Sequence, residues 1–121
     1  MAKDLHITFL LDFYGDMLTD KQREVVECYY NEDLSLAEIA ENYEITRQGV
    51  RDIIVRAEKT LEDIEEKTGL IRRFHQTRAT VSTLRELTTQ IEAINRDRLK
   101  DGELEKLCTQ LSEAMEDLER E

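Results

Sequence analysis

The sequence has no proline and no tryptophan, and its 121 residues include only four glycines. Because proline and glycine interrupt helices, their scarcity beside a charged fraction of 37% excludes a sheet-rich or collagen-like chain. A hydrophobic fraction of 40% is enough for a core, so wholesale disorder is excluded as well. The composition therefore predicts an all-α protein of one domain, or of one small domain with an appendage.

Residues that carry chemistry are also scarce. Cys28 and Cys108 form no CxxC pair, and His6 and His75 are the only histidines, which argues against the usual zinc and redox motifs. The chain has no glycine-rich phosphate loop, so we expect no enzyme activity, no metal and no cofactor. It also lacks a secretory start and the roughly 20 apolar residues of a membrane span. We therefore expect a cytoplasmic protein that does not contact a membrane.

The balance of charge is acidic. Aspartate and glutamate outnumber lysine and arginine by 28 to 17, which gives a net charge of −11. This is the wrong sign for a protein that coats nucleic acid through its overall charge. Any contact with nucleic acid must therefore be local.

The segment from Leu5 to Leu18 is apolar around about two-thirds of a helix. A helix of this kind buries more than one side. It either lies at the centre of a core or offers its second side to another chain. The candidate interface residues are Leu5, Phe9, Leu11, Phe13 and Tyr14.

Three further helices are expected at about 19–31, 36–42 and 46–68, within a helical domain that spans 1–69. Ser35 and Glu38 form a capping-box pattern at the start of the second, and Thr46 can cap the third. The last two, over about 35–62, have the small, apolar and capped positions of a helix-turn-helix. The pattern predicts a DNA-binding three-helix core of winged-helix type.

In a helix-turn-helix the start of the second helix enters the major groove, where arginine pairs with guanine and glutamine with adenine. The candidate groove-facing residues are Thr46, Arg47, Gln48, Arg51 and Val55. The candidate phosphate contacts are Arg56 and Lys59. In the alternative interpretation, Arg47 and Arg51 pair with Glu44 and Asp52 as ordinary surface charges.

The second part of the chain spans 70–121. Its apolar residues recur at helical spacing up to Ile94 and again from Leu104 to Leu118, with Lys100-Asp101-Gly102 between them. This spacing predicts a C-terminal amphipathic helical hairpin or an oligomerisation segment. A hairpin with one apolar stripe per helix must pack on the front domain or on a second copy, and we expect a homodimer.

Residues 18–62 resemble the promoter-reading helix-turn-helix of bacterial sigma factors. Residues 1–75 more closely resemble the YlxM family of small bacterial helix-turn-helix proteins. The motifs that carry this resemblance include Leu10-Leu-Asp-Phe-Tyr-Gly, Asp33-Leu-Ser-Leu-Ala-Glu-Ile-Ala, Thr46-Arg-Gln-Gly-Val-Arg-Asp and Arg56-Ala-Glu. The resemblance implies an all-helical fold and a regulatory link to the signal recognition particle pathway, through gene proximity to its GTPase and receptor.

Two functions are consistent with these patterns. The first is a regulatory helix-turn-helix protein that binds double-stranded DNA. The second is an adaptor that uses the same scaffold to bind the signal recognition particle GTPase or RNA instead of DNA, because a fold does not determine a function. An acidic surface favours the second, since it attracts a basic protein partner.

Overall fold

The computed structural model describes residues 4–120, and every regular element in that range is a helix. The prediction of an all-α fold is therefore confirmed. The chain divides into two compact units: unit 1 ends at Ile71, and unit 2 begins at Arg72. Each unit is described separately below.

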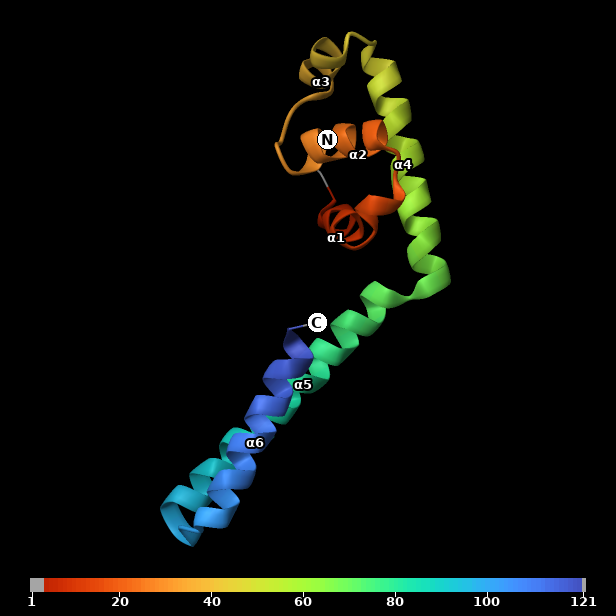
Figure 1. Ribbon diagram of the computed structural model, residues 1–121. Helices are drawn as coiled ribbons and strands as arrows, with labels where there is room; N and C mark the ends of the chain where they lie inside the picture. Colours follow the sequence, from red (N-terminus) through yellow and green to blue (C-terminus); the bar gives the residue numbers. More distant parts are fainter. Residues whose placement is uncertain (1–3, 121) are drawn as a thin grey trace. The chain divides into compact units, whose positions relative to one another are not determined.

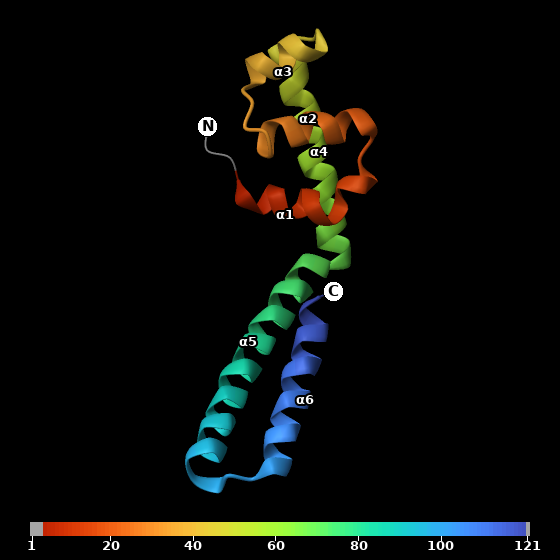
Figure 2. The same ribbon diagram turned by 60° about the vertical axis from the view of Figure 1, so that its left-hand side comes forward.

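Unit 1 is built on one long helix, α4 (Arg47–Thr68), against which three shorter helices pack. These are α1 (Leu5–Tyr14), α2 (Asp20–Tyr30) and α3 (Leu36–Tyr43). A short 3-10 turn, η1 (Gly15–Met17), follows α1. Figures 1 and 2 show α3, α2 and α1 in succession along α4, from its first turn toward its last. Unit 1 therefore has its helix-turn-helix, α3 and α4, at one end.

The helix starts in unit 1 follow directly from local sequence. The Ser35 hydroxyl accepts from the Glu38 backbone N–H at 3.1 Å, and the Glu38 carboxylate accepts from the Ser35 N–H at 3.1 Å. Thr46 Oγ1 accepts from the Gly49 N–H at 2.9 Å. Each bond satisfies a backbone donor that the helix itself leaves without a partner. The capping box at Ser35 and the cap at Thr46 are therefore present as predicted.

Two apolar clusters form the core of unit 1. One joins α1 and α2 to the second half of α4 and includes Leu10, Val26 and Leu61. The other joins α2 and α3 to the first half of α4 and includes Ile39 and Val50. These five side chains have no exposed area. The second cluster fixes the start of α4 against α3.

Unit 2 is an antiparallel pair of helices, α5 (Leu70–Ile94) and α6 (Gly102–Glu119), which lie side by side in both views (Figures 1 and 2). A π-helical turn, η2 (Asn95–Leu99), follows α5. The buried Asn95 side chain closes the loop: its Nδ2 donates to the Asp101 carbonyl at 2.9 Å, and its Oδ1 accepts from the Asp101 N–H at 2.8 Å. One asparagine thereby sets where the chain reverses.

Candidate nucleic-acid interface

The turn between α3 and α4 is closed by its backbone. The Ile45 N–H donates to the Ala40 carbonyl at 3.1 Å, and the Glu44 N–H donates to the Glu41 carbonyl at 3.4 Å. This is the hydrogen-bond pattern of a Schellman motif, which requires a left-handed residue. Glu44 takes that conformation, with φ 57° and ψ 42°, although glycine reaches it at lower cost. Three residues, 44–46, link α3 to α4.

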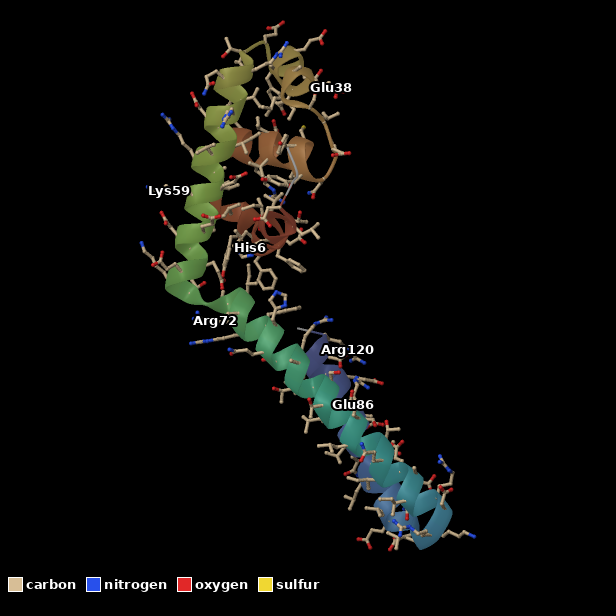
Figure 3. All side chains as sticks on the ribbon, turned by 180° about the vertical axis from the view of Figure 1, so that it is seen from behind. His6, Glu38, Lys59, Arg72, Glu86 and Arg120 are labelled. Atoms are coloured by element: carbon tan, nitrogen blue, oxygen red, sulfur yellow. The ribbon has the colours of Figure 1, made fainter. Side chains whose placement is uncertain are left out.

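The predicted groove-facing residues lie on the outer side of α4. The side chains of Arg47, Gln48, Arg51, Val55 and Arg56 are exposed, as is that of Lys59. Figure 3 shows Lys59 on the side of α4 that faces away from the other three helices of unit 1. Thr46 is exposed as well, but its hydroxyl is already used as the cap of α4. Its side chain therefore positions the helix start.

The cations on this face carry no internal countercharge. Within residues 4–120, none of Arg47, Arg51, Arg56 and Lys59 forms an ion pair. The Asp52 carboxylate accepts instead from Gln48 Nε2 at 2.9 Å. The alternative in which Arg47 and Arg51 pair with Glu44 and Asp52 is therefore not what the structure shows. Two guanidinium groups one turn apart are open to an external anion.

Charge is distributed unevenly along α4. Its first thirteen residues, 47–59, carry four basic side chains and the acids Asp52 and Glu58. Beyond them, Glu62, Asp63 and Glu66 are exposed on the same helix. The amino-terminal end of a helix also carries a partial positive charge from its peptide dipoles. A basic helix start is thus present on a unit whose overall charge is acidic.

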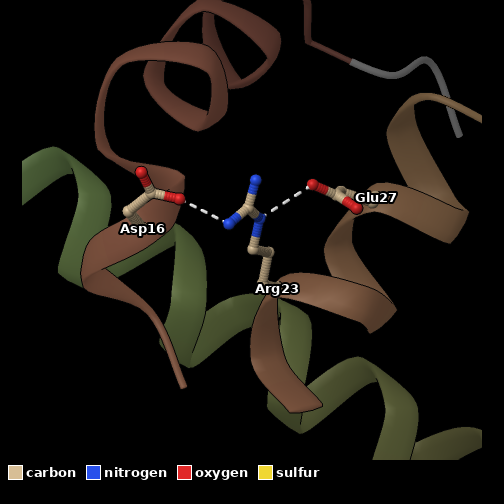
Figure 4. Close-up of polar contacts among 3 residues, drawn as sticks. All are labelled: Asp16, Arg23 and Glu27. Atoms are coloured by element: carbon tan, nitrogen blue, oxygen red, sulfur yellow. Dashed lines mark hydrogen bonds and ion pairs between the residues drawn. The ribbon is translucent and has the colours of Figure 1, made fainter. Parts of the chain in front are cut away.

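Arg23 of α2, another exposed cation of unit 1, forms ion pairs within the unit. It forms ion pairs with Asp16 and with Glu27, the latter at 3.0 Å (Figure 4). The hydrogen bond to Glu27 and the charge of Asp16 raise the pKa of Arg23. Arg23 therefore links the turn after α1 to α2 and is not available to an external anion.

A groove beside the helix start was not predicted from the sequence. It is lined by Arg47 and Arg51 of α4, by the first turn of α3 from Ser35 to Glu38, and by Tyr29, Asp33 and Leu34 before that turn. The amide groups of a first helical turn attract anions, and they lie here beside two guanidinium groups. The capping-box pattern located this turn in the sequence, but only the crossing of α3 and α4 places it next to Arg47 and Arg51.

The candidate interface residues of α1 separate into two groups. Leu5, Phe9 and Phe13 are exposed, whereas Leu11 and Tyr14 are only 5% and 4% exposed. The prediction that Leu11 and Tyr14 contact another chain is corrected: both pack into the cluster with α4. Leu11 and Tyr14 are three residues apart, so both lie on the same face of α1, and this face packs against α4.

The described residues contain no group of three or more histidine, cysteine, aspartate or glutamate side chains that could hold a metal ion. Burial, followed by a hydrogen bond to Glu32, raises the pKa of Cys28, which makes its thiol less reactive. In the range that the structure describes, no helix is long and apolar enough to cross a membrane.

The three-helix core, the tight turn and the exposed start of α4 define a helix-turn-helix protein. The chain belongs to the UPF0122 family, described as "Putative helix-turn-helix protein, YlxM / p13 like", whose profile matches residues 1–101. The predicted resemblance to the YlxM family is therefore confirmed. This is a family of helix-turn-helix proteins and not of enzymes.

Proteins of several bacteria are similar to this chain in sequence. A UPF0122 protein of Thermoanaerobacter sp. strain X514 is 45% identical over 114 residues, which cover 94% of each chain. One of Bacillus cereus strain AH187 is 40% identical over 97 residues, or 80% of this chain and 88% of the relative. One of Desulforamulus reducens is 53% identical over 75 residues, or 61% of this chain and 64% of the relative.

Proposed function

We propose that this chain is a regulatory protein that binds double-stranded DNA, with the first turns of α4 in the major groove. The observation that carries the proposal is the pair Arg47 and Arg51, exposed one turn apart at a capped helix start and free of ion pairs within residues 4–120. Arginine in this position donates two hydrogen bonds to guanine. The helix-turn-helix fold supports the same placement.

Each exposed residue of the face has a role in this proposal. Arg47, Gln48 and Arg51 contact base edges, and Val55 contacts a thymine methyl group. Arg56 and Lys59, further along α4, contact phosphates, and the groove beside Arg47 receives the adjoining backbone. We propose further that the protein acts in the cytoplasm as a homodimer, because two copies of a helix-turn-helix read two half-sites.

The test is a fluorescence-anisotropy titration with short duplexes selected from the source genome. Arg51→Ala is expected to weaken binding about 5-fold to 150-fold, corresponding to about 1 to 3 kcal/mol for a lost base contact. Lys67→Ala is the matched control, because it removes one exposed cation from the last turn of the same helix. Equal affinities for the two variants would contradict the assignment of Arg51.

A second candidate function is an adaptor that contacts the signal recognition particle GTPase or its RNA. The observation that favours a basic protein partner is the exposed acidic end of α4, with Glu62, Asp63 and Glu66. Glu62→Lys with Glu66→Lys is expected to weaken binding to the GTPase and to leave duplex binding unchanged or stronger. The opposite pattern, with Arg51→Ala weakening GTPase binding and the double variant having no effect, would contradict it.

A further inference from the structure

Unit 2 buries very few side chains within its own two helices. The buried residues of unit 2, which begins at Arg72, are Val81, Thr88, Asn95, Cys108 and Met115, and two of these five are polar. Within unit 2, seven large apolar side chains of α5 and α6 are between 40% and 51% exposed. They are Leu84, Leu87, Ile91, Ile94, Leu107, Leu111 and Leu118. The hairpin therefore presents more large apolar residues to solvent than it covers.

The buried and exposed residues occupy different positions of a seven-residue repeat. The buried ones recur every seventh residue, at 81, 88 and 95 and again at 108 and 115. If these are the a positions, Leu84 and Ile91 are d positions and Leu87 and Ile94 are g positions. On α6 the exposed leucines are likewise at d and g. Helices that are apolar at a, d and g have a face wide enough to contact more than one neighbour.

The exposed apolar residues of both helices lie on one side of the hairpin. The e positions mark the other side: Arg85 Nε donates to Glu119 Oε1 at 2.8 Å, and the e residues Glu92 and Ser112 line a polar groove there, together with Thr89 at the adjoining b position. The e and d positions flank the buried a position on opposite sides. Because α5 and α6 run antiparallel, their d and g positions fall together. We call this surface, at positions 84, 87, 91, 94, 107, 111 and 118, the apolar face.

We infer that the apolar face binds the same face of a second copy, so that two hairpins form a four-helix bundle. A two-fold axis brings identical surfaces together and is the commonest symmetry of soluble oligomers. The apolar face must be shielded from water at all times, because each hairpin buries few apolar side chains of its own. A second copy meets that requirement at equal concentration wherever the protein is present. Four helices with apolar a, d and g positions enclose a shared core.

The charge around the apolar face also fits a second copy. The c positions that border its central part, Thr83, Gln90 and Gln110, are uncharged, and the acidic c positions, Asp97, Glu103 and Asp117, border its ends. Residues 72–121 carry 9 basic and 11 acidic side chains, whereas residues 1–71 carry 8 and 17. The excess of like charge that separates two copies therefore resides mainly in unit 1. A strongly charged partner would need a border of the opposite charge.

The size of the face sets the expected affinity. The face spans Leu84 to Ile94 on α5 and Leu107 to Leu118 on α6, so a length of about 18 Å and a width of about 20 Å for two helices give roughly 360 Å² in outline. Because the side chains make the surface uneven, its solvent-accessible area is larger than this outline and closer to the roughly 800 Å² per partner of a standard interface. We therefore expect a dimer that dissociates in the micromolar range. The inference rests on the proposed homodimer and is independent of DNA binding.

The test is sedimentation velocity of the full chain over about 1 to 100 µM, the range in which a micromolar dimer dissociates. The variants Leu87→Glu and Leu111→Glu place a charge on the apolar face, where each native side chain is about half exposed in a single chain. Both are expected to raise the dimer dissociation constant at least tenfold while helicity is retained. Thr89→Glu, on the polar side of α5, is the matched control and is expected to remain dimeric.

Three results would overturn the inference. They are a monomeric wild-type chain throughout this range, an unchanged dissociation constant in both face variants, or loss of the dimer only in Phe9→Glu of α1. Should a face variant lose helicity, the wild-type melting temperature decides, because a dimer is stabilised by concentration and a monomer is not. Arg51→Ala is expected to stay dimeric, so a failure of DNA binding and a failure of this inference give different results.

Discussion

Removing the buried hydroxyl of Tyr14 tests how much its hydrogen bonds to α4 stabilise the packing of α1 on α4. Tyr14 is 4% exposed, and its hydroxyl donates to Glu65 Oε1 at 2.6 Å and lies 2.7 Å from Thr68 Oγ1. The same Glu65 oxygen accepts from the Ile71 N–H at 3.0 Å. Tyr14→Phe keeps the ring in the core and removes its hydrogen bonds to Glu65 and Thr68 at the end of α4.

The magnitude follows from which groups lose a partner. A hydrogen bond to a charged group contributes about 1.5 to 3 kcal/mol. Glu65 is half-buried and Thr68 is exposed, so water replaces part of what is lost. We expect Tyr14→Phe to lower the free energy of unfolding of unit 1 by about 1 to 2 kcal/mol. With a urea dependence of about 2 kcal/mol per molar, the midpoint falls by about 0.5 to 1 M.

The assay is urea unfolding followed by circular dichroism, and the control is Tyr43→Phe. The Tyr43 hydroxyl donates to Glu24 Oε2 at 3.2 Å on the exposed side of unit 1, so its loss is expected to cost less than about 0.5 kcal/mol. Equal midpoints for the two variants would refute the claim that the Tyr14 hydroxyl fastens α1 to α4.

Three further predictions concern the helix-turn-helix. Glu44→Gly relieves a left-handed glutamate and is expected to stabilise unit 1 by about 0.5 to 1 kcal/mol, whereas Glu41→Gly, inside α3, destabilises it by a similar amount; urea midpoints that move in the same direction would contradict this. Thr46→Ala removes the cap of α4 and is expected to cost about 1 kcal/mol by the same assay, while Thr46→Ser retains most of it. Burial and the bond to Glu24 raise the pKa of Tyr43 to about 12, so its contribution is present below pH 10 and is lost as the pH rises toward 12. Tyr43→Phe should therefore lose less stability than wild type over that interval, and parallel pH profiles would be evidence against it.

Local patterns predicted the helix starts because the atoms that cap a helix are its neighbours in sequence. Ser35 with Glu38 and Thr46 show this directly. The end of the first helix is not predicted correctly: the apolar pattern continues to Leu18, but α1 ends at Tyr14 and Leu18 is extended, so that Thr19 can cap α2. The apolar pattern of the segment predicts a helix, but it does not show that the backbone before Thr19 must be extended for Thr19 to cap α2.

Side-chain partners of the site depended on packing that spacing does not encode. The helical wheel placed Arg47 and Arg51 on the outer face of α4, as the structure does. Helical spacing does not show that Gln48 donates a hydrogen bond to Asp52, or that α3 and α4 together form a groove beside the two arginines. In α1, the apolar side chains gave no signal to separate Leu11, which is buried, from its exposed neighbours.

The most direct measurement of the central claim is the salt dependence of binding to genomic duplex fragments, followed by fluorescence anisotropy. The two proposed phosphate contacts, Arg56 and Lys59, give each protomer a slope of log affinity against log salt of about −1.8, or roughly 12-fold between 50 and 200 mM. Lys59→Ala is expected to reduce that slope by about 0.9 and Lys67→Ala to leave it unchanged. A wild-type chain that does not bind duplex DNA at 50 mM salt would contradict the proposal that α4 is a DNA-binding helix.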